Sequence, residues 1–88
     1  MEGVTLADAE TTVHAETIIR ETIQRLVEQR GGAGLEIRSD SRLTTDLGLD
    51  SLELAELSVV LEDEVGYDPF SVGIVPETVA ELVAYYVR

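Results

Sequence analysis

The stretch DLGLDSLELAEL, residues 46–57, joins a turn of small and polar residues to a helical pattern of apolar residues. Asp50 or Ser51 can cap a helix that starts here, because both side chains accept hydrogen bonds from the free amides of a first turn. Glu53 adds a carboxylate where the helix dipole favours negative charge. The sequence therefore predicts a helix that begins at about residue 51.

This middle helix should run to about Val65 and end at Gly66, and its two sides differ. One stripe at helical spacing should face a core and consists of Leu54, Leu57, Leu61 and Val65. The opposite side mixes acids with apolar residues and contains Leu52, Ala55, Glu56, Val59, Glu62 and Asp63. Because single apolar residues are ordinary on surfaces, this side alone fits partner binding and plain solvation equally well.

A first helix is predicted before the stretch, within TTVHAETIIRETIQRLVEQRGG at residues 11–32. Its apolar residues fall near one helical stripe, and Gly31 with Gly32 supplies a stop. The stripe consists of Val13, Ile19, Ile23, Leu26 and Val27. Residues 1–10 are expected to be a loose lead-in. Residues 33–50 have no sustained period but carry isolated leucines and an isoleucine, so we expect a long loop that packs onto the core.

The last third of the chain predicts one further helix. Residues 67–76 mix turn formers with apolar residues and allow at most a short helical turn. In TVAELVAYY, residues 78–86, Thr78 and Glu81 have the spacing of a capping box. The apolar stripe of this segment consists of Val79, Leu82, Val83 and Tyr86. The fold class is therefore all-α: a single domain, residues 1–88, with three main helices, a short helical connector and a long loop between the first and second helices.

Composition excludes several classes of function. The chain has 18 acidic residues against 6 basic ones, all arginine, and a formal net charge of -12. Such a chain repels nucleic acid and anionic membranes and attracts basic protein surfaces. It has no cysteine, so disulfides, thiolate metal sites and a nucleophilic thiol of its own are excluded. Its longest apolar run, at residues 82–87, is too short to cross a bilayer, and we expect a cytoplasmic protein.

Enzymatic and metal sites have little support. Ser51 does not stand in a Gly-x-Ser-x-Gly turn, and the only histidine is His14 in the first helix, so no catalytic residues are assigned. Asp40, Asp46 and Asp50 lack the alternating oxygen ligands, central glycine and distant glutamate of a calcium loop. No metal site is therefore predicted.

A serine at the start of a helix, after a tight turn, is also well placed to carry a phosphodiester, because the helix end offers free amides and positive charge. DLGLDSLELAEL resembles the attachment motif of acyl carrier proteins, and the likeness covers most of the chain. The resemblance implies that Ser51 is esterified with 4'-phosphopantetheine from coenzyme A. It also implies an acyl-carrier-like bundle whose working thiol lies on the prosthetic arm, which agrees with the absent cysteine.

The resemblance further implies a monomeric, non-catalytic carrier whose second helix docks on basic patches of its partners. These partners would be a phosphopantetheinyl transferase and acyl- or aminoacyl-loading and condensing enzymes. The implied partner-binding carboxylates are Asp50, Glu53, Glu56, Glu62 and Asp63. The implied apolar centre consists of Leu52, Ala55 and Val59.

The kind of pathway is indicated by two departures within the chain. YDPFSVGIVP, residues 67–76, lacks the acidic short helix of fatty-acid carriers, which favours a stand-alone carrier of a polyketide or hybrid polyketide and nonribosomal-peptide pathway. LGLDSL differs from the Gly-Gly pattern common in peptidyl carriers, which favours acyl cargo. An aminoacyl or peptidyl carrier is the alternative, and an unmodified acidic interaction module is the alternative from another class.

Overall fold

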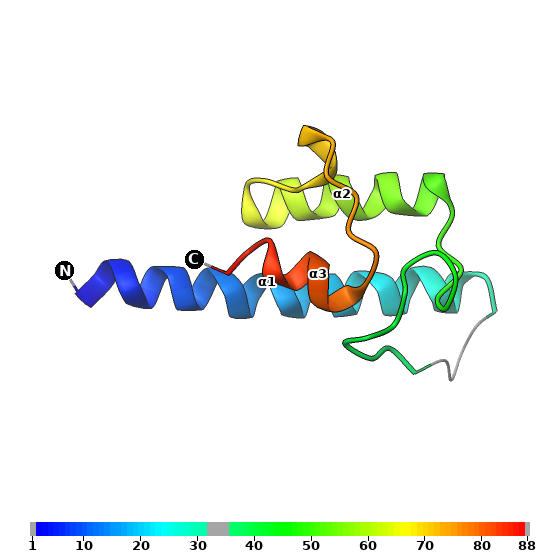
Figure 1. Cartoon of the computed structure of the whole chain (residues 1–88), viewed down its shortest axis with the longest axis horizontal. Coiled ribbons are helices and arrows are strands. Elements are labelled where there is room, and N and C mark those ends of the chain that lie inside the picture. The colour runs from blue at the N-terminus through cyan, green and yellow to red at the C-terminus, as the bar shows by residue number, and fades with distance from the viewer. Residues whose placement is uncertain (1, 32–35, 88) are drawn as a thin grey trace.

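The computed structural model describes residues 2–31 and 36–87. It contains the helices α1 (Glu2–Gln29), α2 (Ser51–Val65) and α3 (Val79–Ala84), with a short 3-10 helix, η1 (Phe70–Val72), between the last two. Helices α2 and α3 both pack on α1, and η1 packs on α2 (Figure 1). The described ranges contain no strand, only an isolated bridge between Arg42 and Thr78. The predicted all-α bundle of three helices with a helical connector is confirmed.

Helices α1 and α2 run antiparallel. Arg30, just after α1, contacts Glu53 in the first turn of α2, with Nε to Oε2 at 3.0 Å. At the other end of the pair, His14 Nε2 lies 3.3 Å from the carbonyl oxygen of Glu64. The start of α2 therefore lies beside the end of α1 (Figure 1).

One core joins the three helices and the loop. It consists of Ala15, Ile19, Ile23, Leu26, Val27, Leu43, Leu47, Leu49, Leu57, Leu61, Val79, Leu82 and Tyr86. The predicted stripes of α2 and α3 lie in this core or pack against it. The first stripe is right except at Val13, which is 65% exposed. Val13 precedes Ile19 by six residues, which at 100° per residue places it about 120° away from the stripe, and Ala15 takes the core position instead.

The two ends of the chain differ from the prediction. Helix α1 starts at Glu2, so residues 2–10 are helical and are not a loose lead-in. They lack an apolar stripe, yet they contain no proline and continue a helix that has already formed, so nothing in the sequence breaks it. Helix α3 ends at Ala84, and Thr78 caps it by accepting from the Glu81 amide at 3.1 Å. Glu81 Oε1 accepts from the amide of Glu77, so only half of the predicted capping box forms.

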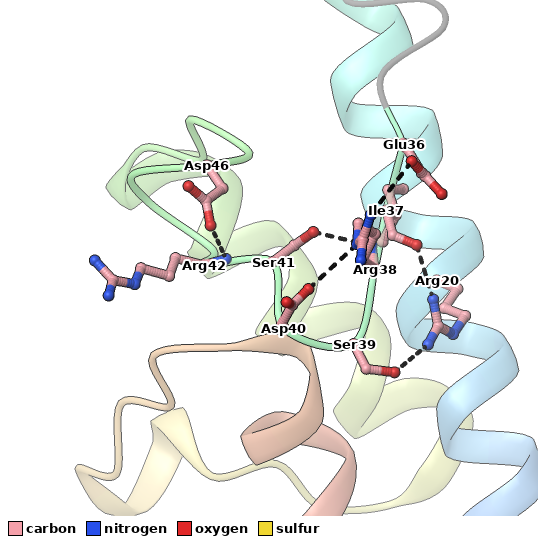
Figure 2. A network of polar contacts seen from close by, with 9 residues as sticks. All are labelled: Arg20, Glu36, Ile37, Arg38, Ser39, Asp40, Ser41, Arg42 and Asp46. Atoms are coloured by element: carbon pink, nitrogen blue, oxygen red, sulfur yellow. Dashed lines mark hydrogen bonds and ion pairs between the residues drawn. The ribbon is translucent and has the colours of Figure 1, made fainter.

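The loop before α2 is fixed at both of its sides. Arg20 of α1 donates to the Ile37 carbonyl and to Ser39 Oγ, both at 3.1 Å, as Figure 2 shows. On the other side, the Leu43 amide donates to the Glu77 carbonyl at 2.9 Å, just before α3. Three loop leucines lie in the core: Leu43, Leu47 and Leu49. The predicted packing of the loop is confirmed, and residues 33–35 of the predicted range lie outside the described residues.

A buried carboxylate fastens η1 to α2. Asp68 is 2% exposed and accepts from Ser58 Oγ at 2.9 Å. It also accepts from the backbone amide and the hydroxyl of Ser71, both at 2.8 Å. Beside it, burial is the main cause that raises the pKa of Tyr86, with the negative charge of Asp68 adding to it. Asp68 therefore satisfies three donors from two elements.

Replacing Asp68 should be costly. Asp68→Ala leaves three donors without their acceptor, and we expect a loss of about 2–3 kcal/mol in the free energy of unfolding, measured by urea denaturation. The control is Asp63→Ala, because Asp63 is an exposed acid on the same helix as Ser58 and should change stability by less than about 0.5 kcal/mol. Equal stabilities of the two variants would contradict the assigned role of Asp68.

Candidate functional site: the start of helix α2

The cap of α2 is Asp50. Its Oδ1 accepts from the backbone amide of Glu53 at 2.8 Å, and Glu53 Oε1 accepts in return from the backbone amide of Asp50 at 3.1 Å. The two side chains form a reciprocal capping box. From the sequence, either Asp50 or Ser51 could cap this helix. The structure shows that the cap is Asp50.

Ser51 is the first residue of α2 and is exposed. Within residues 2–31 and 36–87 its hydroxyl has no hydrogen-bond partner. The backbone around it is fixed, because Leu49 is buried and Leu54 packs against the core. The hydroxyl can therefore be esterified without breaking a hydrogen bond of the fold.

Arg30 holds the turn and the cap together. Its Nε donates to Glu53 Oε2 at 3.0 Å, and its Nη2 donates to the carbonyl of Leu47. The guanidinium lies so close to Gly48 that a Cβ there would be 3.2 Å from Nη1. Gly48 also has φ +71°, a conformation that side chains strongly disfavour. The backbone conformation at position 48 therefore favours glycine, and the guanidinium of Arg30 leaves little space for a side chain there.

The expected partner-binding residues lie along α2, but their environments differ. Leu52 and Val59 are 76% and 67% exposed, and Ala55 is exposed as well. Glu62 and Asp63 are exposed and form no ion pair within the part of the chain that the structure describes. The carboxylates nearest α1 are engaged: Glu53 with Arg30, and Glu56 with Arg25 at 2.9 Å.

Sequence reasoning did not identify these two arginines. Arg25 and Arg30 meet residues 31 and 23 positions away, so no local spacing points to either pair. Their effect on the surface is direct. With its side chain 16% exposed and its two oxygens occupied, Glu53 is the least available of the expected partner-binding carboxylates.

The other acids of the loop are also engaged within the chain. Asp46 Oδ2 accepts from the Arg42 amide at 2.8 Å, and Asp40 pairs with Arg38 at 3.4 Å, as Figure 2 shows. In the described ranges, no three histidine or acidic side chains are placed to hold a metal ion. No helix among the described residues is long and apolar enough to span a membrane.

Comparison with known families is decisive. A family profile described as "phosphopantetheine attachment site" matches residues 18–86, most of the chain. The chain belongs to this family. Its members carry covalently attached 4'-phosphopantetheine and hold their cargo on it as a thioester, so the protein is a carrier protein. Carrier domains of this family interact with phosphopantetheinyl transferases and biosynthetic enzymes. A comparison with solved structures found no match.

The start of α2 fits this prosthetic group. The group needs a serine hydroxyl that solvent reaches. The hydroxyl of Ser51 is exposed and forms no hydrogen bond with any described residue. The position at the N-terminus of a 15-residue helix also favours the negative charge of a phosphodiester. In the carrier protein, Asp50 and Leu49 fix the backbone on which the ester would stand.

Because Asp50 caps α2 and Ser51 does not, substitutions at the two positions should have unequal effects on stability. In the unmodified carrier protein, Asp50→Ala should lower the free energy of unfolding by about 1 kcal/mol, because the Glu53 amide loses its acceptor. Ser51→Ala should change it by less than about 0.5 kcal/mol. Urea denaturation measures both, and the reverse ranking would make Ser51 the cap.

Proposed function

We propose that Ser51 is the residue that carries 4'-phosphopantetheine, and that the protein presents acyl thioesters to enzymes of a polyketide or hybrid polyketide and nonribosomal-peptide pathway. The observation that carries this proposal is the free, exposed hydroxyl of Ser51 next to a helix cap that Asp50 and Glu53 make without it. The hydroxyl stands in an Asp-Ser-Leu motif inside the region that the family profile matches.

The residues around Ser51 have supporting roles in this function. When bound, the group supplies the thiol that forms the thioester, which a chain without cysteine lacks. Asp50 keeps the first turn of α2 formed, and buried Leu49 keeps the turn before it on the core. The chain itself thus provides a fixed position at the edge of the bundle.

A catalytic role for Ser51 is disfavoured by distance. The only histidine, His14, lies beside Glu64 near the far end of α2. Glu64 lies 13 positions after Ser51 along α2, which at 1.5 Å per residue is about 20 Å. A base at that distance cannot take a proton from the serine hydroxyl, and this supports a carrier rather than an enzyme.

The proposed partner surface is the exposed side of α2. Leu52, Ala55 and Val59 would form its apolar centre, with Glu62 and Asp63 as carboxylates free to meet arginine or lysine. Asp50, Glu53 and Glu56 would add to the negative potential of this surface. The charges of Glu53 and Glu56 are partly offset by their ion pairs with Arg30 and Arg25. Rim charges mainly set association rate and discrimination, so docking should be transient and should weaken as salt rises.

The segment between α2 and α3 supports the pathway assignment. Its helix, η1, has three residues and no acid. The nearest carboxylate in the sequence, Asp68, is buried and accepts hydrogen bonds from Ser58 and Ser71. Val72 and Val75 are exposed there instead. This is a different surface from the acidic short helix of fatty-acid carriers, so the proposed cargo belongs to a specialised pathway.

Attachment of the group is tested by mass. With coenzyme A and a broad-specificity phosphopantetheinyl transferase, the wild type should gain the mass of one phosphopantetheine, and Ser51→Ala should gain nothing. The matched control is Ser58→Ala, because Ser58 lies on the same helix but donates its hydroxyl to Asp68. That variant should still gain one group.

The outcomes separate the alternatives. A folded wild type that takes no group would point to the unmodified interaction module. A gain that persists in Ser51→Ala would move the attachment to another residue. Intact mass spectrometry of the protein from its native host identifies the cargo, and an aminoacyl mass would replace the acyl assignment.

A further inference from the structure

We infer that Arg30 is a positioning residue for the attachment of the group: it fixes the chain on both sides of Ser51 from the end of α1. This inference rests on the proposed function, in which Ser51 is the residue that is modified. Arg30 does not act on the hydroxyl itself. It acts through the turn that precedes Ser51 and through the cap that holds the first turn of α2.

The contact with the cap runs through Glu53. Arg30 Nε donates to Oε2 of that carboxylate at 3.0 Å, while Oε1 accepts from the Asp50 amide at 3.1 Å. Arg30 therefore sets the orientation of the side chain that closes the capping box. The Glu53 side chain is 16% exposed, so its ion pair is less screened by solvent than a fully exposed pair.

The contact with the turn involves Leu47 and Gly48. Arg30 Nη2 donates to the carbonyl of Leu47, and the guanidinium lies against the backbone of Gly48. Leu47 and Leu49 are buried, so the turn packs on the core through these two side chains. Arg30 contacts the backbone of the same turn. One planar guanidinium group thus contacts residues 47, 48 and 53, and Ser51 lies between these contacts in the sequence.

Arg25 offers a close comparison. It also joins α1 to α2, with Nη1 donating to Glu56 Oε2 at 2.9 Å. Its side chain is 46% exposed, similar to the 41% of Arg30. Its partner lies in the second turn of α2, away from the cap. Removing either arginine deletes one ion pair with a glutamate of α2, but of the two only Arg30 also contacts the turn at Leu47 and Gly48.

The attachment step explains why position matters. Ser51 Oγ forms a bond to the phosphorus of the pantetheine phosphate in coenzyme A, and the bond from that phosphorus to the bridging oxygen of the diphosphate breaks. Adenosine 3',5'-bisphosphate leaves with that oxygen, and the hydroxyl proton passes to a base of the transferase. Displacement at phosphorus requires the attacking oxygen in line, so a displaced turn lowers the rate within the complex.

The test compares three variants as substrates of a broad-specificity phosphopantetheinyl transferase, with the concentration of unmodified carrier varied. Arg30→Ala should lower kcat about tenfold and leave KM within about threefold, because the docking side of α2 remains. Arg25→Ala should keep the kcat of the wild type. Arg30→Lys should fall between, because an ammonium keeps the charge but cannot reproduce the planar fork on Glu53, Leu47 and Gly48.

A second measurement does not use the transferase. Backbone amide exchange by NMR should be faster at Asp50 and Glu53 in Arg30→Ala than in the wild type, and unchanged there in Arg25→Ala. If Arg30→Ala does not fold, Glu53→Gln replaces it in both measurements. Its side-chain carbonyl can still accept from the Asp50 amide, but it loses the ion pair with Arg30, so it should also lower kcat and speed exchange at Asp50.

The results distinguish two failures. A wild type that is modified while Arg30→Ala, or Glu53→Gln in its place, matches its kcat would overturn the role of Arg30 alone. An equal loss of kcat in Arg25→Ala would overturn it too, because a general loosening of the two helices would then explain both. A wild type that takes no group would overturn the proposed function and this inference with it.

Discussion

The hydrogen bond from the Glu53 amide to the Asp50 carboxylate caps α2 and leaves the hydroxyl of Ser51 unused. A helix needs its first amides satisfied, and serine is one of the residues that commonly do this. Here Asp50 does it, so the hydroxyl of Ser51 takes no part in holding the helix. The residue proposed to be modified can then change its chemistry without changing the hydrogen bonds that hold the helix.

That cap depends in turn on non-local contacts. The loop before α2 brings Leu43, Leu47 and Leu49 into the core, while Arg20 and the Glu77 carbonyl hold its earlier part. In a chain of 88 residues the core is thin, and the loop contributes three of its buried leucines. The position of Ser51 is therefore tied to the stability of the whole bundle.

Local spacing was enough to predict the helices, because the α2 and α3 stripes repeat at intervals that only a helix brings to one face. It also singled out Ser51. It could not choose between Asp50 and Ser51 as the cap, since both are good acceptors, and it missed Arg25 and Arg30, whose partners are distant in sequence. Asp68 was missed for the same reason: its burial depends on how η1 meets α2. The helical start at residues 2–10 was missed because no apolar stripe marks it.

The separation of cap and carrier is tested most directly at the Glu53 amide, before and after the group is attached. Amide exchange by NMR measures how firmly this amide is bonded in each form. If α2 is capped without the Ser51 hydroxyl, the protection of the Glu53 amide stays within about threefold when Ser51 is modified. A loss of protection of more than about tenfold on modification would show that the Ser51 hydroxyl helps to hold the helix, and would contradict the account.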